Sequence, residues 1–155
     1  MIQHNVDVRI ARIFNTYGPA MAFNDGRVVS NFITQALLGL PVSIYGGGGQ
    51  TRSFCYVSDL IEGIIALMNC ESVDGPVNLG SDNEISVKEL AENINDLVGS
   101  KSVIEVQNLP EDDPKIRRPD LQKSRTILGW SAEVSLQAGL TRTIQDFKSR
   151  LLVNQ

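Results

Sequence analysis

The chain has 155 residues, a formal net charge of −4 at pH 7, 42% hydrophobic residues and 21% charged residues. This length fits one domain, and the composition is that of an ordinary soluble globular protein. The acidic balance argues against nonspecific nucleic-acid binding, which needs a basic surface, but it leaves room for a small anionic ligand held by local arginines. No apolar run has the length of a membrane span and no signal-peptide pattern opens the sequence, so we expect a cytoplasmic protein without a membrane partner.

Metal and redox chemistry find little support in the sequence. The only cysteines are Cys55 and Cys70, which have no CxxC spacing, and His4 is the only histidine. With so few soft ligands we expect no structural metal site. Both thiols are expected to be buried and reduced, as is usual in the cytosol.

Apolar spacing and turn residues predict strands that alternate with helices, which is the pattern of an α/β fold. The predicted strands are 6–14, 77–79 and 103–106, with two more inside the stretch 42–59, one at Val42 and Ile44 and one at Phe54 and Tyr56. The predicted helices are 28–40, 60–69, 86–98, 120–128 and 135–151. Pro41 is expected to stop the first helix. In the second helix, Leu60, Ile61, Ile64, Ile65 and Met68 are expected to face a buried position.

Three helix ends carry local signals. Ser86 and Glu89 have the spacing of a capping box at the start of one helix, and Gly99 is placed to end it. Gly129 is expected to end the short helix that follows, and Ser135 to cap the last one. We see neither an internal repeat nor a linker between domains, so residues 1–155 are expected to form a single α/β unit.

The stretch Val42–Asp59 is the most informative part of the chain. It reads as a strand, a hairpin of four glycines, a second strand and the opening of a helix, which Ser58 would cap and Asp59 would stabilise through the helix dipole. Glycines allow close approach of backbone N–H groups to a ligand, and Arg52 offers a planar fork of donors suited to phosphate. A plain turn beside a solvated arginine explains the same residues. A nucleotide P-loop is excluded because the Gly-Lys-Ser/Thr ending is missing.

Three segments in register carry a family resemblance: Arg12–Pro19, Ser43–Asp59 and Asp112–Asp120. Together they resemble the C-terminal half of an extended short-chain dehydrogenase/reductase that acts on nucleotide sugars, and within that superfamily the UDP-glucuronate decarboxylases. The resemblance runs from about Val6 to Leu151. It implies the C-terminal part of a Rossmann-like fold with the small sugar-nucleotide-binding subdomain.

Two motifs of the complete family are missing from these 155 residues: the Gly-x-x-Gly-x-x-Gly turn that binds NAD and the catalytic Tyr-x-x-x-Lys pair. The resemblance therefore implies a chain without its N-terminal NAD-binding half. In the complete enzyme NAD would oxidise C4 of UDP-glucuronate, the β-keto acid would lose CO2, and the hydride would return to give UDP-xylose. The present chain is expected to bind the UDP-sugar and to be inactive without the missing half.

The resemblance also implies roles for individual residues. Arg52 would bind the diphosphate, and Asn15 would contact the diphosphate or the sugar. Arg27 would touch NAD or a phosphate. From the residues alone, Asn15 would be expected to stabilise its turn through its own backbone, and Arg27 also fits an exposed, solvated side chain.

The other implied site residues lie at the two ends of the ligand. Ser43, Ile44 and Tyr45 would frame the uracil ring, although the same residues also suit the core of a strand. Arg117 would line the sugar end and handle the carboxylate or deliver a proton, which makes it the one candidate catalytic residue. A slip by one position to Arg118, or a loop salt bridge from Arg117 to Asp112 or Asp113, remains open.

Other functions and partners fit the same residues. A dTDP-glucose 4,6-dehydratase or a UDP-sugar 4-epimerase fragment stays within the superfamily, although the 112–120 pattern favours the decarboxylases. A non-catalytic nucleotide-binding or interaction module is the alternative from another class. A chain without its N-terminal half should expose the apolar face that this half covers, so a homo-oligomer is expected.

Overall fold

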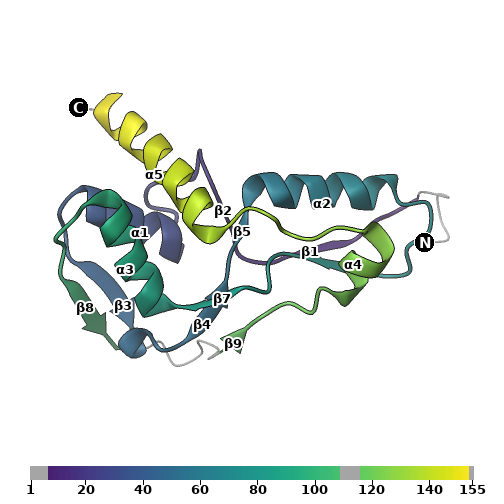
Figure 1. Ribbon diagram of the computed structural model, residues 1–155, viewed down its shortest axis with the longest axis horizontal. Helices are drawn as coiled ribbons and strands as arrows, with labels where there is room; N and C mark the ends of the chain where they lie inside the picture. Colours follow the sequence, from purple (N-terminus) through teal and green to yellow (C-terminus); the bar gives the residue numbers. More distant parts are fainter. Residues whose placement is uncertain (1–6, 109–115, 154–155) are drawn as a thin grey trace.

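The computed structural model describes residues 7–108 and 116–153, and for Ile116 and Arg117 it describes the backbone only. The chain has the predicted α/β class, and its parts form two lobes that lie side by side (Figure 1). The α1–α3–α5 lobe holds the helices α1 (Val28–Leu37), α3 (Val87–Val98) and α5 (Leu136–Val153). The α2–α4 lobe holds α2 (Val57–Asn69) and α4 (Gln122–Leu128).

Short strands, most of them in parallel pairs, run through both lobes. Strand β1 (Ala11–Ile13) pairs with β6 (Val77–Leu79), β2 (Thr16–Tyr17) with β5 (Cys55–Tyr56), and β3 (Val42–Tyr45) with β8 (Ile104–Gln107). The central strand β4 (Thr51–Ser53) pairs antiparallel with β7 (Glu84–Ser86) and parallel with β9 (Ile116–Arg117). Asp112 and Asp113, which the sequence offered as partners of Arg117, lie outside the described residues.

The predicted glycine hairpin is wrong. Strands β3 and β4 flank the glycines but belong to different sheets, and the short 3-10 turn η1 (Gly46–Gly48) redirects the chain between them. The predicted alternation holds for β3, where Val42 and Ile44 are buried. It fails after β4, where Phe54, Cys55 and Tyr56 are all buried because the chain there runs between the two lobes.

Two hydrophobic clusters form the core, one in each lobe. The larger cluster packs α1, α3 and α5 around Tyr17, whose hydroxyl donates to the Leu136 carbonyl over 3.2 Å. The smaller cluster surrounds Trp130 between α2 and β6. Strand β5 joins them, because Cys55 belongs to the smaller cluster and Tyr56 to the larger.

The predicted helix ends are confirmed where a cap residue or a glycine acts on its own backbone neighbours. Ser86 and Glu89 form a capping box at α3, and Gly99 ends that helix in the left-handed conformation, as Gly129 ends α4. Helix α1 ends earlier than predicted, at Leu37, because the chain turns at Gly39 before Pro41 is reached. Ser58 does not cap α2, which begins at Val57 with no side-chain cap.

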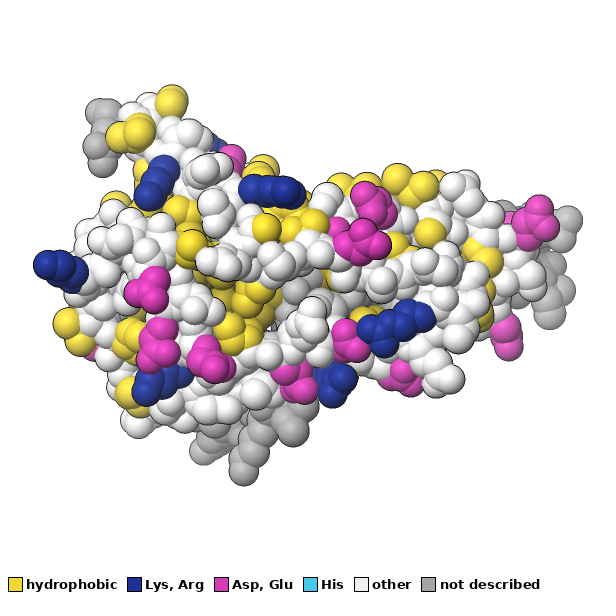
Figure 2. All heavy atoms as spheres, in the orientation of Figure 1, with side chains coloured by type: hydrophobic (Ala, Val, Ile, Leu, Met, Phe, Trp, Pro, Cys, Tyr) yellow, Lys and Arg dark blue, Asp and Glu magenta, His cyan; other side chains and the backbone are white. Residues whose placement is uncertain are grey.

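The predicted buried face of α2 is partly wrong. Leu60 and Leu67 face inward, whereas Ile61 and Ile65 are each 51% exposed and Met68 is 70% exposed. Strand β1 is shorter than the predicted 6–14 and has β6 as its only described partner. Ile13 at its end and Ile10 just before it are both exposed. Figure 2 shows the apolar surface along α2. We call Ile61, Ile65 and Met68 the α2 stripe.

Each cysteine is a free thiol, but only Cys55 is buried, so the expectation of two buried thiols is wrong for the half-exposed Cys70. Burial is the main cause that raises the pKa of the Cys55 thiol to about 12, and the nearby Asp59 carboxylate adds to it. Among the described residues, no helix is both long enough and apolar enough to cross a membrane.

Replacement of Gly48 should destabilise the fold, whereas replacement of its neighbour Gly49 should have little effect. Gly48 has φ +72°, and a Cβ there would lie 2.9 Å from Ile44 Cδ1 and 3.1 Å from the Lys88 backbone nitrogen. Gly49 has φ −76° and open space around it. We expect Gly48→Ala to lose at least ~1–2 kcal/mol in urea unfolding. Gly49→Ala should change the free energy of unfolding by less than ~0.5 kcal/mol, and equal losses in both variants would contradict the assignment.

Candidate functional site

Two adjoining pockets lie between the start of α1, the end of β3 and β4. The larger has a volume of about 320 Å³ and the smaller about 100 Å³. Arg52 and Val28 line both, so the two pockets adjoin, and we call the pair the Arg52 cleft. The larger pocket is of the size in which proteins hold small ligands. It is lined by Gly26, Val28, Asn31, Phe32, Ser43, Ile44, Tyr45, Gln50, Arg52 and Val87.

Arg52 is the one strongly buried cation among the described residues, with only 7% of its surface exposed. It lies in the middle of β4, in register with Ile85 on one side and with Arg117 on the other. Its Nη1 donates to the Thr51 carbonyl over 2.7 Å. Because burial removes the screening effect of water, this guanidinium attracts an anion more strongly than a surface arginine does.

Asn15 enters the smaller pocket from the link between β1 and β2, together with Thr16 and Arg27. Its Nδ2 donates to the Ser53 carbonyl over 3.3 Å, and its own carbonyl accepts from the Cys55 amide over 2.8 Å. Asn15 therefore fixes the turn against β4 and also lines the cleft beside Arg52. The side chain thus bonds to a distant strand and not to the backbone of its own turn, and it lies where a ligand in the cleft would meet it.

Strand β3 forms the wall of the larger pocket. Ile44 is buried and Tyr45 is exposed at the rim, while Ser43 is held by Gln35 and Gln107. The glycine turn ends with Gln50, whose Nε2 reaches back to the Tyr45 carbonyl over 2.9 Å. This wall combines an apolar surface with backbone and amide groups, as the sites that bind flat polar rings do.

Arg27 closes the smaller pocket at the start of α1. Its Nε donates to Asp25 Oδ2 over 2.7 Å, and its guanidinium is mostly exposed. Partial burial acts to raise the pKa of Asp25, but hydrogen bonds from Ser30 and Arg27 outweigh it, so the pKa lies below its ordinary value. Asp25 thus stays ionised and fixes the position of Arg27.

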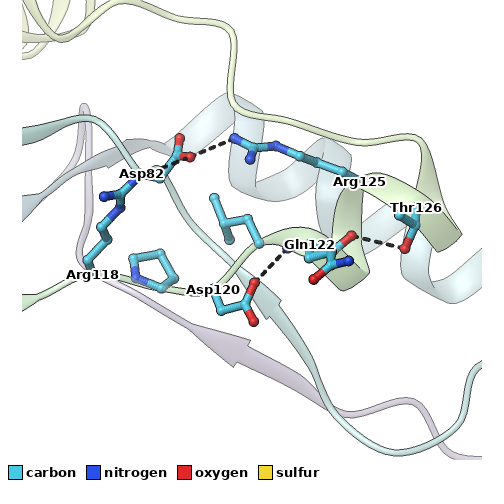
Figure 3. Close-up of a pocket in the computed structure, with 8 residues that line it drawn as sticks. Asp82, Arg118, Asp120, Gln122, Arg125 and Thr126 are labelled. Atoms are coloured by element: carbon cyan, nitrogen blue, oxygen red, sulfur yellow. Dashed lines mark hydrogen bonds and ion pairs between the residues drawn. The ribbon is translucent and has the colours of Figure 1, made fainter.

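Arg118 lies apart from the cleft, in a separate polar pocket of about 520 Å³ near α4 (Figure 3). Its guanidinium is 3.9 Å from Asp82 and 3.6 Å from Glu84. Arg125 donates to the same Asp82 over 2.8 Å, and this bond is the main cause that lowers the pKa of Asp82. Arg118 therefore lines the polar pocket and not the Arg52 cleft. For Arg117 the structure gives only the backbone, in register with Arg52.

Six of the seven residues singled out from the sequence thus line one cleft, and the seventh, Arg117, is a neighbour of Arg52 in the sheet. Asn31, Gln50 and Met21 also line the cleft, although the sequence did not reveal them. Asn31 could have been found from the sequence, since it follows Arg27 by one helical turn and therefore lies on the same face of α1. Met21 could not, because the conformation of its loop is set by distant contacts.

The chain is similar to known proteins in both sequence and structure. Residues 2–80 match the model of the NAD dependent epimerase/dehydratase family. UDP-glucuronic acid decarboxylase 1 of Xenopus tropicalis is 52% identical over 151 residues, which cover 97% of this chain and 36% of that protein. The chain thus spans about a third of the length of that relative.

Solved structures reproduce the fold. The UDP-glucose 4-epimerase of Thermotoga maritima with UDP-glucose superposes with a TM-score of 0.86 at 28% identity, over 92% of this chain and 46% of that one. The UDP-glucuronic acid 4-epimerase of Bacillus cereus in complex with UDP-glucuronic acid and NAD gives 0.85 at 27% identity, over 92% and 45%. These neighbours have the Rossmann-like fold of extended short-chain dehydrogenases/reductases. From its sequence match and from its fold, this chain belongs to the NAD dependent epimerase/dehydratase family.

Proposed function

We propose that this chain is the sugar-nucleotide-binding portion of an NAD-dependent UDP-glucuronate decarboxylase-like enzyme, which converts UDP-glucuronate to UDP-xylose and CO2. The observation that carries the proposal is the Arg52 cleft, where a buried guanidinium stands between two adjoining pockets. The identity of about 50% to UDP-glucuronic acid decarboxylases supports this choice within the family.

In this proposal each part of the cleft takes one part of the ligand. Ser43, Ile44 and Tyr45 frame the uracil ring, and Arg52 binds the diphosphate with two parallel N–H bonds. Asn15 contacts the diphosphate or the sugar. Arg117 is the catalytic candidate, because its backbone lies beside that of Arg52 and its side chain can carry the charge that a carboxylate substrate needs.

The residues that the structure describes do not by themselves make a cradle for NAD. The only glycine run of the sequence is Gly46–Gly49, and it connects two strands of different sheets, whereas a dinucleotide needs a glycine turn between a strand and the N-terminus of a helix. We therefore assign no hydride step to these residues. Arg27, at the exposed end of the smaller pocket, is the residue proposed to reach NAD or a phosphate from this side.

The second candidate is a UDP-sugar 4-epimerase, because structural neighbours at 27–28% identity carry that name. The two reactions differ in their products. The full-length protein incubated with UDP-glucuronate should release CO2 and form UDP-xylose if it is a decarboxylase, whereas a 4-epimerase would keep the carboxylate and form the C4 epimer. Formation of the C4 epimer without CO2 would contradict the proposed function.

The binding role is tested on the chain itself by titration with UDP in a calorimeter. The proposal expects saturable binding with one site per chain. Absence of binding at millimolar UDP would contradict it. If this chain binds UDP at submicromolar concentration and the full-length protein does not convert UDP-glucuronate, a stand-alone binding module would be favoured instead.

We further propose that the α2 stripe and the open edge of β1 face a further part of the enzyme, an N-terminal Rossmann half, and that the enzyme works in the cytoplasm. Parallel strands are normally buried on both faces, and a two-stranded sheet is marginal alone. Ile13 of β1 and Ile10 just before it are instead exposed, as is the α2 stripe.

The chain alone should therefore self-associate through this surface. We expect its average mass in light scattering to rise with concentration, since large apolar patches attract one another. Ile65→Lys should reduce the association, because it places a charge in the middle of the α2 stripe. Leu152→Lys, at an exposed apolar residue of α5 outside the stripe, should leave it unchanged. A monodisperse monomer at high concentration would contradict the expectation.

A further inference from the structure

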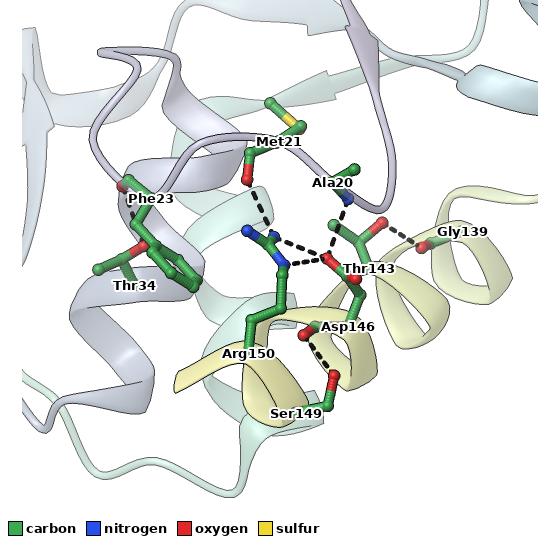
Figure 4. Close-up of polar contacts among 9 residues, drawn as sticks. All are labelled: Ala20, Met21, Phe23, Thr34, Gly139, Thr143, Asp146, Ser149 and Arg150. Carbon is green, nitrogen blue, oxygen red and sulfur yellow. Dashed lines mark hydrogen bonds and ion pairs between the residues drawn. The ribbon is translucent and has the colours of Figure 1, made fainter. Parts of the chain in front are cut away.

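The last helix holds a loop that is distant in sequence. Residues 18–26 pass between α1 and α5, and Asp146 and Arg150 of α5 reach this loop (Figure 4). Asp146 Oδ2 accepts from the Ala20 amide over 3.0 Å and from Arg150 Nε over 2.9 Å. Arg150 Nη2 donates to the Met21 carbonyl over 2.9 Å and to Asp146 Oδ2 over 2.6 Å. The ion pair thus binds two consecutive backbone groups of the loop.

Aromatic contacts fix the same guanidinium. Arg150 Cζ lies 4.5 Å from the ring centre of Phe23 and 4.8 Å from that of Phe147, and the two rings meet edge to face at 5.1 Å. Phe147 is fully buried in the core, and the Phe23 carbonyl accepts from Thr34 of α1 over 3.1 Å. The loop is therefore anchored to α5 at Phe23, Met21 and Ala20 and to α1 at Phe23. The ring faces attract the guanidinium electrostatically, so these contacts add to the hydrogen bonds that hold the loop.

The loop depends on these contacts for its conformation. Ala20 has φ +64° and is the only non-glycine with positive φ among the described residues. A residue with a Cβ pays a steric penalty in this region, so contacts outside the loop must offset it. Asp146, which accepts the Ala20 amide, is placed to do so.

The same loop carries part of the cleft wall. Met21 lines the smaller pocket beside Asn15 and Arg52, and Gly26 lines the larger one. The ion pair is partly buried: the side chain of Arg150 is 32% exposed and that of Asp146 is 24% exposed. Neither residue belongs to the hydrophobic core cluster to which α5 contributes Leu140, Ile144 and Phe147. Because Arg150 also lies against the Phe147 ring, the effect of its removal on the loop has to be followed at the loop itself.

We propose that Asp146 and Arg150 are positioning residues of the ligand site: they hold loop 18–26 in place so that Met21 and Gly26 stand against the bound nucleotide. The identity of the ligand in this inference rests on the proposed function. The positioning role rests on two hydrogen bonds, which join residues separated by 126 and by 129 positions in the sequence. It assigns a role in substrate binding to a helix that contributes no lining residue to the cleft.

The test compares Arg150→Met, Arg150→Lys and Asp146→Asn with Arg142→Met. Arg142 is the matched control, since it is an arginine of the same helix α5 that contacts the Tyr56 ring at 5.7 Å instead of the loop. UDP affinity is measured by calorimetry below the melting temperature of every variant, and hydrogen exchange of peptide 18–26 is measured without ligand. We expect Arg150→Met to weaken UDP binding about tenfold, which corresponds to about 1.4 kcal/mol of binding free energy. We also expect faster hydrogen exchange of the loop in this variant.

The conservative variants separate positioning from folding. Arg150→Lys keeps the charge opposite Asp146 and should recover part of the affinity, whereas Asp146→Asn should lose as much as Arg150→Met. Unchanged affinity and unchanged exchange in Arg150→Met would overturn the inference, as would an equal loss in Arg142→Met. A wild-type chain that does not bind UDP would contradict the proposed function; in that case unchanged loop exchange in Arg150→Met overturns the positioning role, and faster exchange supports it.

Discussion

Arg52→Met is expected to weaken UDP binding by about 100-fold, because two charge-assisted hydrogen bonds to phosphate at ~1.5–3 kcal/mol each are lost from a buried site. Arg52→Lys should recover only part of this loss, since an ammonium keeps the charge but not the planar fork. The fold should survive both changes, because the methionine and lysine stems can fill the space of the buried arginine on β4. Calorimetric titration with UDP measures the effect.

The matched control for Arg52 is Arg125→Met. It removes one positive charge as well, so the overall field of the protein changes equally. Arg125 lies on α4 and faces the polar pocket around Asp82, away from the Arg52 cleft. We expect its variant to bind UDP within twofold of the wild-type chain. Equal losses in the two variants would show that UDP binding follows net charge and not the cleft.

The largest loss of stability is expected for Asp59→Ala. Asp59 is 4% exposed, and its Oδ2 accepts from the amides of Glu133 and Val134 over 3.0 and 2.9 Å. The change leaves two backbone donors without an acceptor, at ~1–3 kcal/mol each. We expect a loss of about 3 kcal/mol, which corresponds to a decrease of about 10 °C in the melting temperature.

Urea unfolding followed by Trp130 fluorescence gives a direct readout, because Trp130 Nε1 donates to the Asp59 carbonyl over 3.0 Å in the same segment. Asp59→Asn keeps an oxygen for the two amides and should lose only about 1 kcal/mol. Glu62→Ala, at an exposed carboxylate on the same helix, should lose less than ~0.5 kcal/mol. If Asp59→Ala were no worse than Glu62→Ala, the two hydrogen bonds would not stabilise the fold.

The elements that the sequence predicted well are those with local signals. Ser86 with Glu89, Gly99 and Gly129 act on their own backbone neighbours, so the ends of α3 and α4 could be predicted without knowledge of the fold. Asp59 was expected to stabilise the start of α2 through the helix dipole. Its contacts to the segment before α5 could not be expected, because they join residues 74 and 75 positions apart.

The failures concern long-range packing. Helix α2 is apolar on several sides, so its periodicity could not tell which side faces the core, and Ile61 and Ile65 were placed inside wrongly. The glycine run suggested a hairpin because two strands flank it, but their partners, β8 and β7, come much later in the chain. Pairing of strands depends on which surfaces meet in the folded protein, and no short motif specifies it.

The candidate site was predicted largely by resemblance, and the fold explains why its residues meet. Asn15, Arg27 and Arg52 come from three separate parts of the sequence and line one pocket because β2 pairs with β5 and α1 follows the same loop. Met21 was missed, since a methionine in a loop has no pattern that distinguishes it. The role of Arg150 depends on α5 crossing this loop, which the sequence alone does not specify.

Strand β5 limits the insertions and deletions that the segment between β4 and α2 can accept. Cys55 and Tyr56 point into two different clusters, and they connect β4 directly to α2. Insertion or deletion of a single residue here would exchange the two side chains between the lobes and rotate α2 relative to Arg52. The glycine turn is different, because Gly47 and Gly49 have open space around them. Length changes in descendants of this chain should therefore be absent between Arg52 and Val57, and any that occur in the turn should leave Gly48 in place.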